Sequence, residues 1–199
     1  MKTLSRVYDS YAQARATVDD LERAGVPASD ISIVANKYVS AEYADVEDVS
    51  TTGAAAGTGA GIGTAVGGGA GLLAGLGLLA IPGLGPVVAA GWLAATAVGA
   101  VAGAATGGIV GALVGAGMEP DEAQVYSEAI RRGGTLVTVR VADGDVARVD
   151  AIMAGYRPID PAVRGAEYRK TGWQTFDPKA PPYRPSQAEV DRMRANWPN

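Results

Sequence analysis

The chain has 199 residues, a formal net charge of −4 and no cysteine or histidine. This length fits one or two domains. Without cysteine and histidine there are no disulfides, thiolate nucleophiles, imidazole bases or usual zinc ligands. The acidic balance leaves no basic footprint for nucleic acid. We therefore expect no enzyme, with no catalytic residue, cofactor, metal site or small-molecule substrate.

Charge divides the chain into segments of different chemistry. Residues 49–118 contain no Asp, Glu, Lys or Arg and hold 21 of the 28 glycines. We predict four units: the first half of an α/β domain (1–48), a glycine-zipper insertion (49–118), the second half of the domain (119–163) and a Pro- and aromatic-rich C-terminal arm (164–199). The first residues lack the apolar core of a signal peptide.

The first half of the α/β domain is predicted as strand, helix, strand. A short strand covers residues 4–8, and Asp9 or Ser10 can cap the helix that follows. Gly25 ends this helix. Residues 31–34 then alternate as a strand does.

The second half repeats the theme. A helix begins around Pro120 and ends at Gly133–Gly134, and residues 135–141 form a strand. A further helix runs from Asp143 or Asp145 to Met153, and residues 157–160 are a possible last strand. Two such βαβ units predict a ferredoxin-like α+β domain, and two unrelated βα fragments are the alternative.

Glycine recurs at every fourth position in the insertion. The rows that we expect to pack helices or copies together are Gly59, Gly63, Gly67, Gly71 and Gly75, then Gly99, Gly103, Gly107, Gly111 and Gly115. A glycine inside a helix costs about 0.5–1 kcal/mol relative to alanine. The close approach of another helix, which a groove of glycines permits, can offset this cost.

The insertion is predicted as two antiparallel helices, about 51–81 and 86–117, joined by a turn at 81–86. Gly91 extends the second glycine row backward. Apolar residues gather near the turn, and the tip is represented by Leu76, Leu79, Ile81, Leu84 and Trp92. A nucleotide-binding loop at 57–63 is disfavoured because no strand precedes it. A disordered glycine linker is the remaining alternative.

The uncharged insertion is long enough to enter a bilayer. We expect a homo-oligomer at the cytoplasmic membrane, with the apolar tip in lipid and the α/β domains facing the cytoplasm. A soluble cytoplasmic assembly that buries the tips in a protein core is the alternative. The C-terminal arm is predicted to dock its aromatic residues on the α/β domain or on a neighbouring copy, or else to be a mobile tail.

The layout resembles a known family. Residues 7–10, 21–25 and 30–34, followed after a glycine-rich insertion by residues 131–139, resemble the bacterial heat-induced or general stress domain (YflT-like). The resemblance implies a stress-associated structural or interaction protein and brings no catalytic residues with it.

Overall fold

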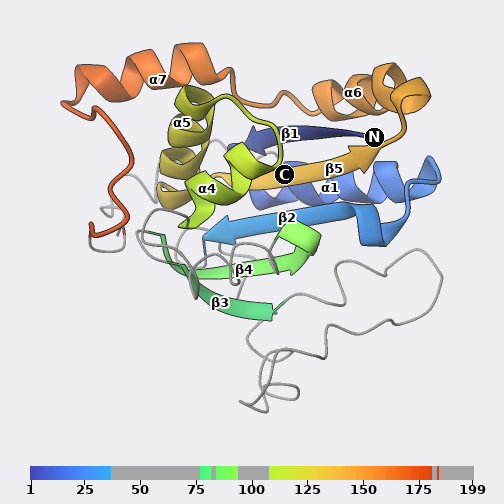
Figure 1. Ribbon diagram of the computed structural model, residues 1–199, viewed down its shortest axis with the longest axis horizontal. Coiled ribbons are helices and arrows are strands. Elements are labelled where there is room, and N and C mark those ends of the chain that lie inside the picture. The colour runs from blue at the N-terminus through green and yellow to red at the C-terminus, as the bar shows by residue number, and fades with distance from the viewer. Residues whose placement is uncertain (37–76, 82–83, 94–107, 181–182, 184–199) are drawn as a thin grey trace.

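The computed structural model describes residues 1–36, 77–81, 84–93, 108–180 and 183. Its centre is one antiparallel sheet with the strand order β1-β5-β2-β4-β3. The strands are β1 (Lys2–Tyr8), β2 (Ile31–Asn36), β3 (Gly77–Ile81), β4 (Gly85–Gly91) and β5 (Thr135–Val141). In Figure 1 they run from β1 at the top to β3 at the bottom. The predicted α+β class is confirmed.

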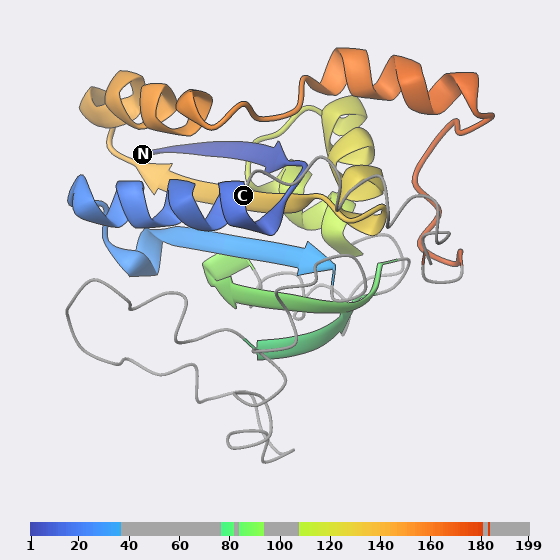
Figure 2. The same ribbon diagram turned by 180° about the vertical axis from the view of Figure 1, so that it is seen from behind.

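Helices cover both faces of the sheet. They are α1 (Tyr11–Arg23), α4 (Gly108–Gly115), α5 (Pro120–Arg131), α6 (Val146–Gly155) and α7 (Pro161–Lys170), with short 3-10 turns η1 (Ala28–Asp30) and η4 (Asp143–Asp145). The helices α4 and α5 lie in front of the sheet in Figure 1, and α1 lies in front of it in the reverse view of Figure 2. The sheet is therefore the middle layer of three.

The boundaries of α1 follow from local chemistry. The Ser10 hydroxyl accepts a hydrogen bond from the Gln13 N–H at 3.2 Å, which caps the first turn. Gly25 has a φ of 87° after the last turn, and the Val26 N–H donates back to the Leu21 carbonyl at 3.0 Å. This is a Schellman ending, which favours glycine. The predicted cap and stop of this helix are confirmed.

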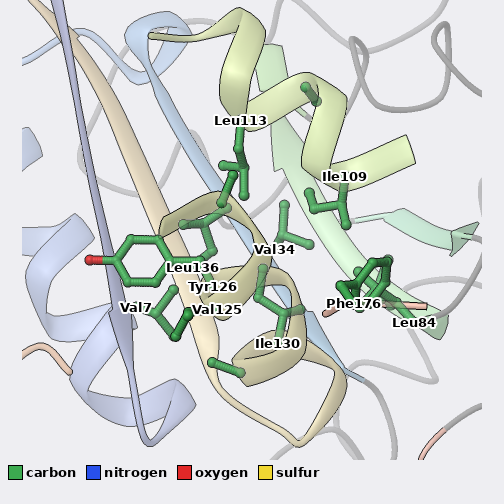
Figure 3. Close-up of a cluster of buried hydrophobic side chains, with 14 of the residues drawn as sticks. Val7, Val34, Leu84, Ile109, Leu113, Val125, Tyr126, Ile130, Leu136 and Phe176 are labelled. Carbon is green, nitrogen blue, oxygen red and sulfur yellow. The ribbon is translucent and has the colours of Figure 1, made fainter. Parts of the chain in front are cut away.

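The sheet separates two apolar clusters. Every residue of β2 is buried, because successive side chains point to opposite faces and both faces are covered. Ile31 and Ile33 contribute to the cluster under α1 and α6, whereas Val34 contributes to the cluster under α4 and α5. Figure 3 shows this second cluster, which includes Leu136 of β5.

Two buried tyrosines should make the free energy of unfolding depend on pH above about 10. The Tyr8 hydroxyl donates to the Met153 carbonyl at 2.9 Å, and burial raises the pKa of Tyr8 to about 12. Burial also raises the pKa of Tyr126. Below the unfolded value of about 10, both states hold the proton and stability is complete. As pH rises from about 10 towards 12, only the unfolded state loses protons, so stability falls by up to about 1.4 kcal/mol per pH unit for each tyrosine.

Urea unfolding at pH 8 to 11.5 measures this loss. The Tyr8→Phe variant is the control, and it should show a shallower decline because one of the titrating groups is gone. An equal decline in both proteins would contradict the role assigned to Tyr8.

The predicted helical hairpin is wrong at its turn. β3 ends at Ile81 and β4 begins at Gly85, so the turn is where the sequence places it, but it joins strands. The reason lies outside the insertion: β2 is buried, and its outer edge needs hydrogen-bond partners. β4 supplies them, pairing Asn36 with Val87 through to Ser32 with Gly91.

Gly91 therefore has a different role from the one predicted. A Cβ at this position would lie 2.2 Å from the Ile31 carbonyl oxygen and 2.7 Å from the Ser32 Cα, and φ is 91°. Glycine here permits close approach of β4 to β2, not of one helix to another. Of the predicted second helix, the described residues contain α4 at its C-terminal end.

The end of the domain differs from the prediction in two respects. Residues 157–160 form no strand, although the Ile159 N–H donates to the Val7 carbonyl at 2.8 Å. Residues 161–170, predicted as the end of the second half of the domain and the start of the arm, form α7. Asp160 caps this helix by accepting from the N–H groups of Ala162 and Val163, and Pro161 fits its first turn.

Candidate interaction site

Most of the predicted packing glycines lie outside the described residues. These are Gly59, Gly63, Gly67, Gly71, Gly75, Gly99, Gly103 and Gly107. Gly111 and Gly115 are described, and both belong to α4. Among the predicted packing glycines, those of α4 are therefore the ones whose surroundings the structure describes.

The helix α4 has an inner and an outer side. Ile109, Ala112 and Leu113 are buried in the cluster shared with α5. Val114 is 38% exposed, and Gly115 is also exposed, with nothing within 4 Å of the position of an added Cβ. This side of α4 is apolar and contains glycine. Within the described part of the chain, no helix packs against it at Gly115.

The residues predicted as the tip occupy different positions in the structure. Leu84 is fully buried in the cluster of Figure 3 and Trp92 is partly buried against that cluster. The Arg140 guanidinium lies 5.0 Å from the centre of the Trp92 ring. Leu79 and Ile81 stand in β3, and Leu76 lies outside the described residues. Leu84 therefore lies in the core of the domain, immediately before the strand β4 that pairs with β2.

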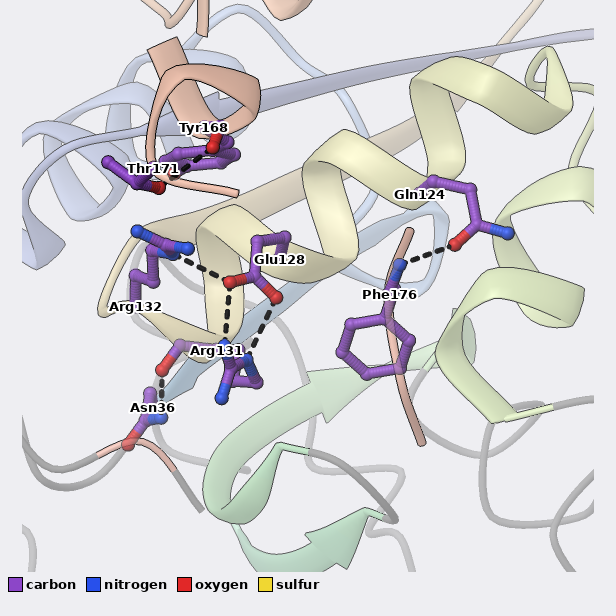
Figure 4. A network of polar contacts seen from close by, with 8 residues as sticks. All are labelled: Asn36, Gln124, Glu128, Arg131, Arg132, Tyr168, Thr171 and Phe176. Atoms are coloured by element: carbon purple, nitrogen blue, oxygen red, sulfur yellow. Dashed lines mark hydrogen bonds and ion pairs between the residues drawn. The ribbon is translucent and has the colours of Figure 1, made fainter. Parts of the chain in front are cut away.

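A buried carboxylate organises the C-terminal end of α5 (Figure 4). Glu128 is 1% exposed and accepts from Arg131 Nε at 2.8 Å, Arg131 Nη2 at 2.7 Å and Arg132 Nε at 2.6 Å. These hydrogen bonds raise the pKa of the Arg131 guanidinium. The Asn36 amide donates to the Arg131 carbonyl at 2.9 Å, which ties the end of β2 to the same place. The Glu128 carboxylate and the Arg131 guanidinium are therefore each positioned by several hydrogen bonds.

This cluster was not predicted from the sequence, although the sequence contains a signal for it. Glu128 stands three and four residues before Arg131 and Arg132, which is the spacing of neighbours on one side of a helix. Sequence spacing alone does not distinguish an exposed ion pair from a buried one. In the folded chain α7 packs beside this cluster, and the centre of its Tyr168 ring lies 4.4 Å from the Arg132 guanidinium.

The chain after α7 docks on α5. The Gln124 side-chain oxygen accepts from the Phe176 N–H at 3.0 Å and from the Thr175 hydroxyl at 3.0 Å. Phe176 is buried in the second cluster, and Trp173 packs edge-on against Tyr168. The predicted docking of arm aromatics on the α/β domain is confirmed for Trp173 and Phe176. The predicted short helix near the C-terminus lies outside the described residues.

The described residues offer little for metal or membrane chemistry. Among them, no group of three or more Asp or Glu side chains is placed to hold a metal ion. Within the same residues, no helix combines the length and the apolar character needed to cross a bilayer. The acidic side chains instead form ion pairs such as Arg6–Asp150 at 2.7 Å and Arg140–Asp30 at 2.8 Å.

Comparison with protein families identifies the first part of the chain. The family model described as the heat induced stress protein YflT domain matches residues 3–80. Residues 3–80 of the chain match a YflT domain. This match confirms the resemblance found in the sequence and makes the protein stress-associated. No curated protein and no solved structure matches the chain.

The YflT match stops short of a strand that the domain needs. It includes β1 and β2, which do not pair with each other, since β5 lies between them. Residues 135–141 of β5 pair with β1 on one side and with β2 on the other. The folded unit that contains the YflT domain therefore extends at least to the end of β5.

Proposed function

We propose that the protein is a stress-associated interaction protein whose copies assemble through the glycine-spaced surface of residues 49–118. The observation that carries the proposal is the outer side of α4, where Gly115 is exposed and meets nothing within 4 Å of an added Cβ. Val114 beside it is an exposed large apolar residue. A second copy of this chain is the partner that we propose for this surface.

Glycine in a helix has an energetic cost, which calls for a compensating contact. A glycine in the interior of a helix, such as Gly111 in α4, costs about 0.5–1 kcal/mol relative to alanine. Close packing of another helix across the glycine can return this cost through dispersion and Cα–H···O contacts. Gly111 and Gly115 continue the four-residue spacing of the preceding uncharged sequence. We therefore propose that Gly99, Gly103, Gly107, Gly111 and Gly115 serve one purpose, the approach of another helix.

The domain that displays this surface is, in our proposal, a ferredoxin-like domain with an added hairpin. β1 and β2 both run antiparallel to β5 between them, which is the arrangement of a split βαβ unit. The hydrogen bond from Ile159 to Val7 stands where a fourth strand would pair with β1. No catalytic role is proposed, because this fold is a scaffold whose function depends on the surfaces it carries.

For location we propose a cytoplasmic assembly in which apolar residues of the insertion are buried in protein. The burial of Leu84, Val87 and Leu93 in the domain core supports this version over insertion of the tip into lipid. Fractionation of untagged protein tests it. Recovery with membranes after a high-salt and alkaline wash would favour the cytoplasmic-membrane version, with lipid as the partner.

Gly115→Leu tests the assembly. The new side chain has open space in the single chain, so the fold should remain intact, but it fills the groove that a second copy would use. We expect the average mass in solution, measured by light scattering after size exclusion, to fall below that of the parent protein. Gly67→Leu and Gly107→Leu should act in the same direction.

Gly155→Leu is the matched control. Gly155 is also the last residue of a helix, is also exposed, and also has nothing within 4 Å of an added Cβ. It lies on α6, outside the glycine row. The same mass for both variants as for the parent protein would show that Gly115 takes no part in assembly.

A further inference from the structure

The two edges of the sheet differ in how they are protected. β1 forms one edge, carries Lys2 and Arg6, and receives a hydrogen bond from the Ile159 N–H. β3 forms the other edge, and its sequence Gly-Leu-Leu-Ala-Ile contains no charge and no proline. Charge, proline and covering segments are the usual means by which an edge strand avoids pairing with another chain. Within the described residues, β3 pairs with β4 on one side and with no strand on the other.

We propose that β3 is a dimerisation strand, and that the edge which the described residues leave unpaired pairs antiparallel with β3 of a second copy. An exposed edge presents unpaired N–H and C=O groups that another strand can complete. A twofold axis at Leu79 places Leu79 opposite itself, Leu78 opposite Ala80, and Gly77 opposite Ile81. The sheets of two copies then join into one.

The second copy is favoured as the occupant by the charge of the surroundings. Residues 49–118 carry no ionisable side chain, so two copies meet at this edge without charge repulsion from the strand or its flanking sequence. Like charges directly opposite each other destabilise strand pairs. A different protein would need some side-chain feature to be recognised, and the five residues of β3 offer only apolar side chains and glycine. Identical strands of equal length match each other without any such feature.

This contact is independent of the one proposed for α4. A twofold contact joins the same surface of two copies. Two different twofold contacts on one chain link copies beyond a dimer, either into a closed tetramer or into an extended array. Loss of the α4 contact should therefore leave β3 dimers, and loss of the β3 contact should leave α4 dimers.

The absence of cysteine from the chain makes a direct test possible. In the full-length Leu79→Cys variant, the two thiols stand opposite each other across the twofold axis. Opposed residues of an antiparallel pair have Cα atoms about 4.5–5.5 Å apart, which lies within the range for a disulfide. In the Ile81→Cys variant of the same strand, the two thiols are roughly 14 Å apart, four residues along the pair.

Both variants are treated with the same mild oxidant and followed on non-reducing gels, after circular dichroism has shown that they fold. We expect Leu79→Cys to form a covalent dimer about tenfold faster than Ile81→Cys or more, because paired thiols react at a raised effective concentration. The same difference should persist in the Gly115→Leu background, which separates this proposal from the α4 assembly. Equal rates would indicate random collision, and no dimer in either variant would indicate that residues of the same chain cover the edge. Either result would overturn the proposal.

Discussion

Glu128→Gln is expected to lower the free energy of unfolding by about 3 kcal/mol, since removing one member of a buried ion pair leaves its partners uncompensated. Glu128 is 1% exposed and receives three hydrogen bonds from two guanidinium groups. A glutamine keeps the volume but loses the charge, and its NH₂ group faces donors. Arg131 and Arg132 are then partly buried without a counter-charge.

Urea unfolding at pH 7 measures this effect, and Glu167→Gln is the control. Glu167 makes the same kind of ion pair at the surface, with Arg164 at 3.6 Å, and its side chain is 59% exposed. Exposed pairs contribute about 0–1 kcal/mol, so the control should scarcely change stability. Equal and small effects of the two substitutions would show that the burial of Glu128 has no energetic consequence.

Leu84→Ala should cost about 3 kcal/mol, a typical value for removing a buried leucine side chain from a packed core. Leu84 is fully buried among Val34, Ile109 and Phe176, residues from three distant parts of the chain. The measurement is the midpoint and slope of urea unfolding, compared with Val163→Ala. Val163 is 58% exposed, and its truncation should change stability by less than about 0.5 kcal/mol.

This experiment also distinguishes two views of the insertion. If the residues around the turn formed a tip that entered lipid, Leu84 would contribute nothing to the stability of the domain in solution. The alanine variant would then unfold like the parent protein. A loss of about 3 kcal/mol would instead show that the insertion is part of the domain core.

The sequence by itself determined the local elements of the domain. The strand at 135–141 has the predicted bounds, and the helix after Ser10 begins and ends where its cap and Gly25 indicate. These features depend on neighbours within a few residues, namely caps, stops and alternating side chains. The family resemblance rested on the same local patterns, and the match to residues 3–80 confirmed it.

The strand conformation of β3 and β4 depends on contacts with distant parts of the chain. Their glycine spacing led us to predict helices, although valine favours strands. The buried edge of β2 decided for the strand, since its hydrogen-bonding groups needed a partner. That edge is brought into place by β5, more than a hundred residues after the start of β2.

The glycine row could be predicted from the sequence, whereas the burial of Glu128 could not. The row is a periodicity within one segment, visible without any knowledge of the fold. The burial of Glu128 arises because α7 and the end of β2 converge on α5, through Tyr168 and Asn36. Contacts between segments distant in sequence leave no local pattern, so the folded chain alone shows which charges are withdrawn from water.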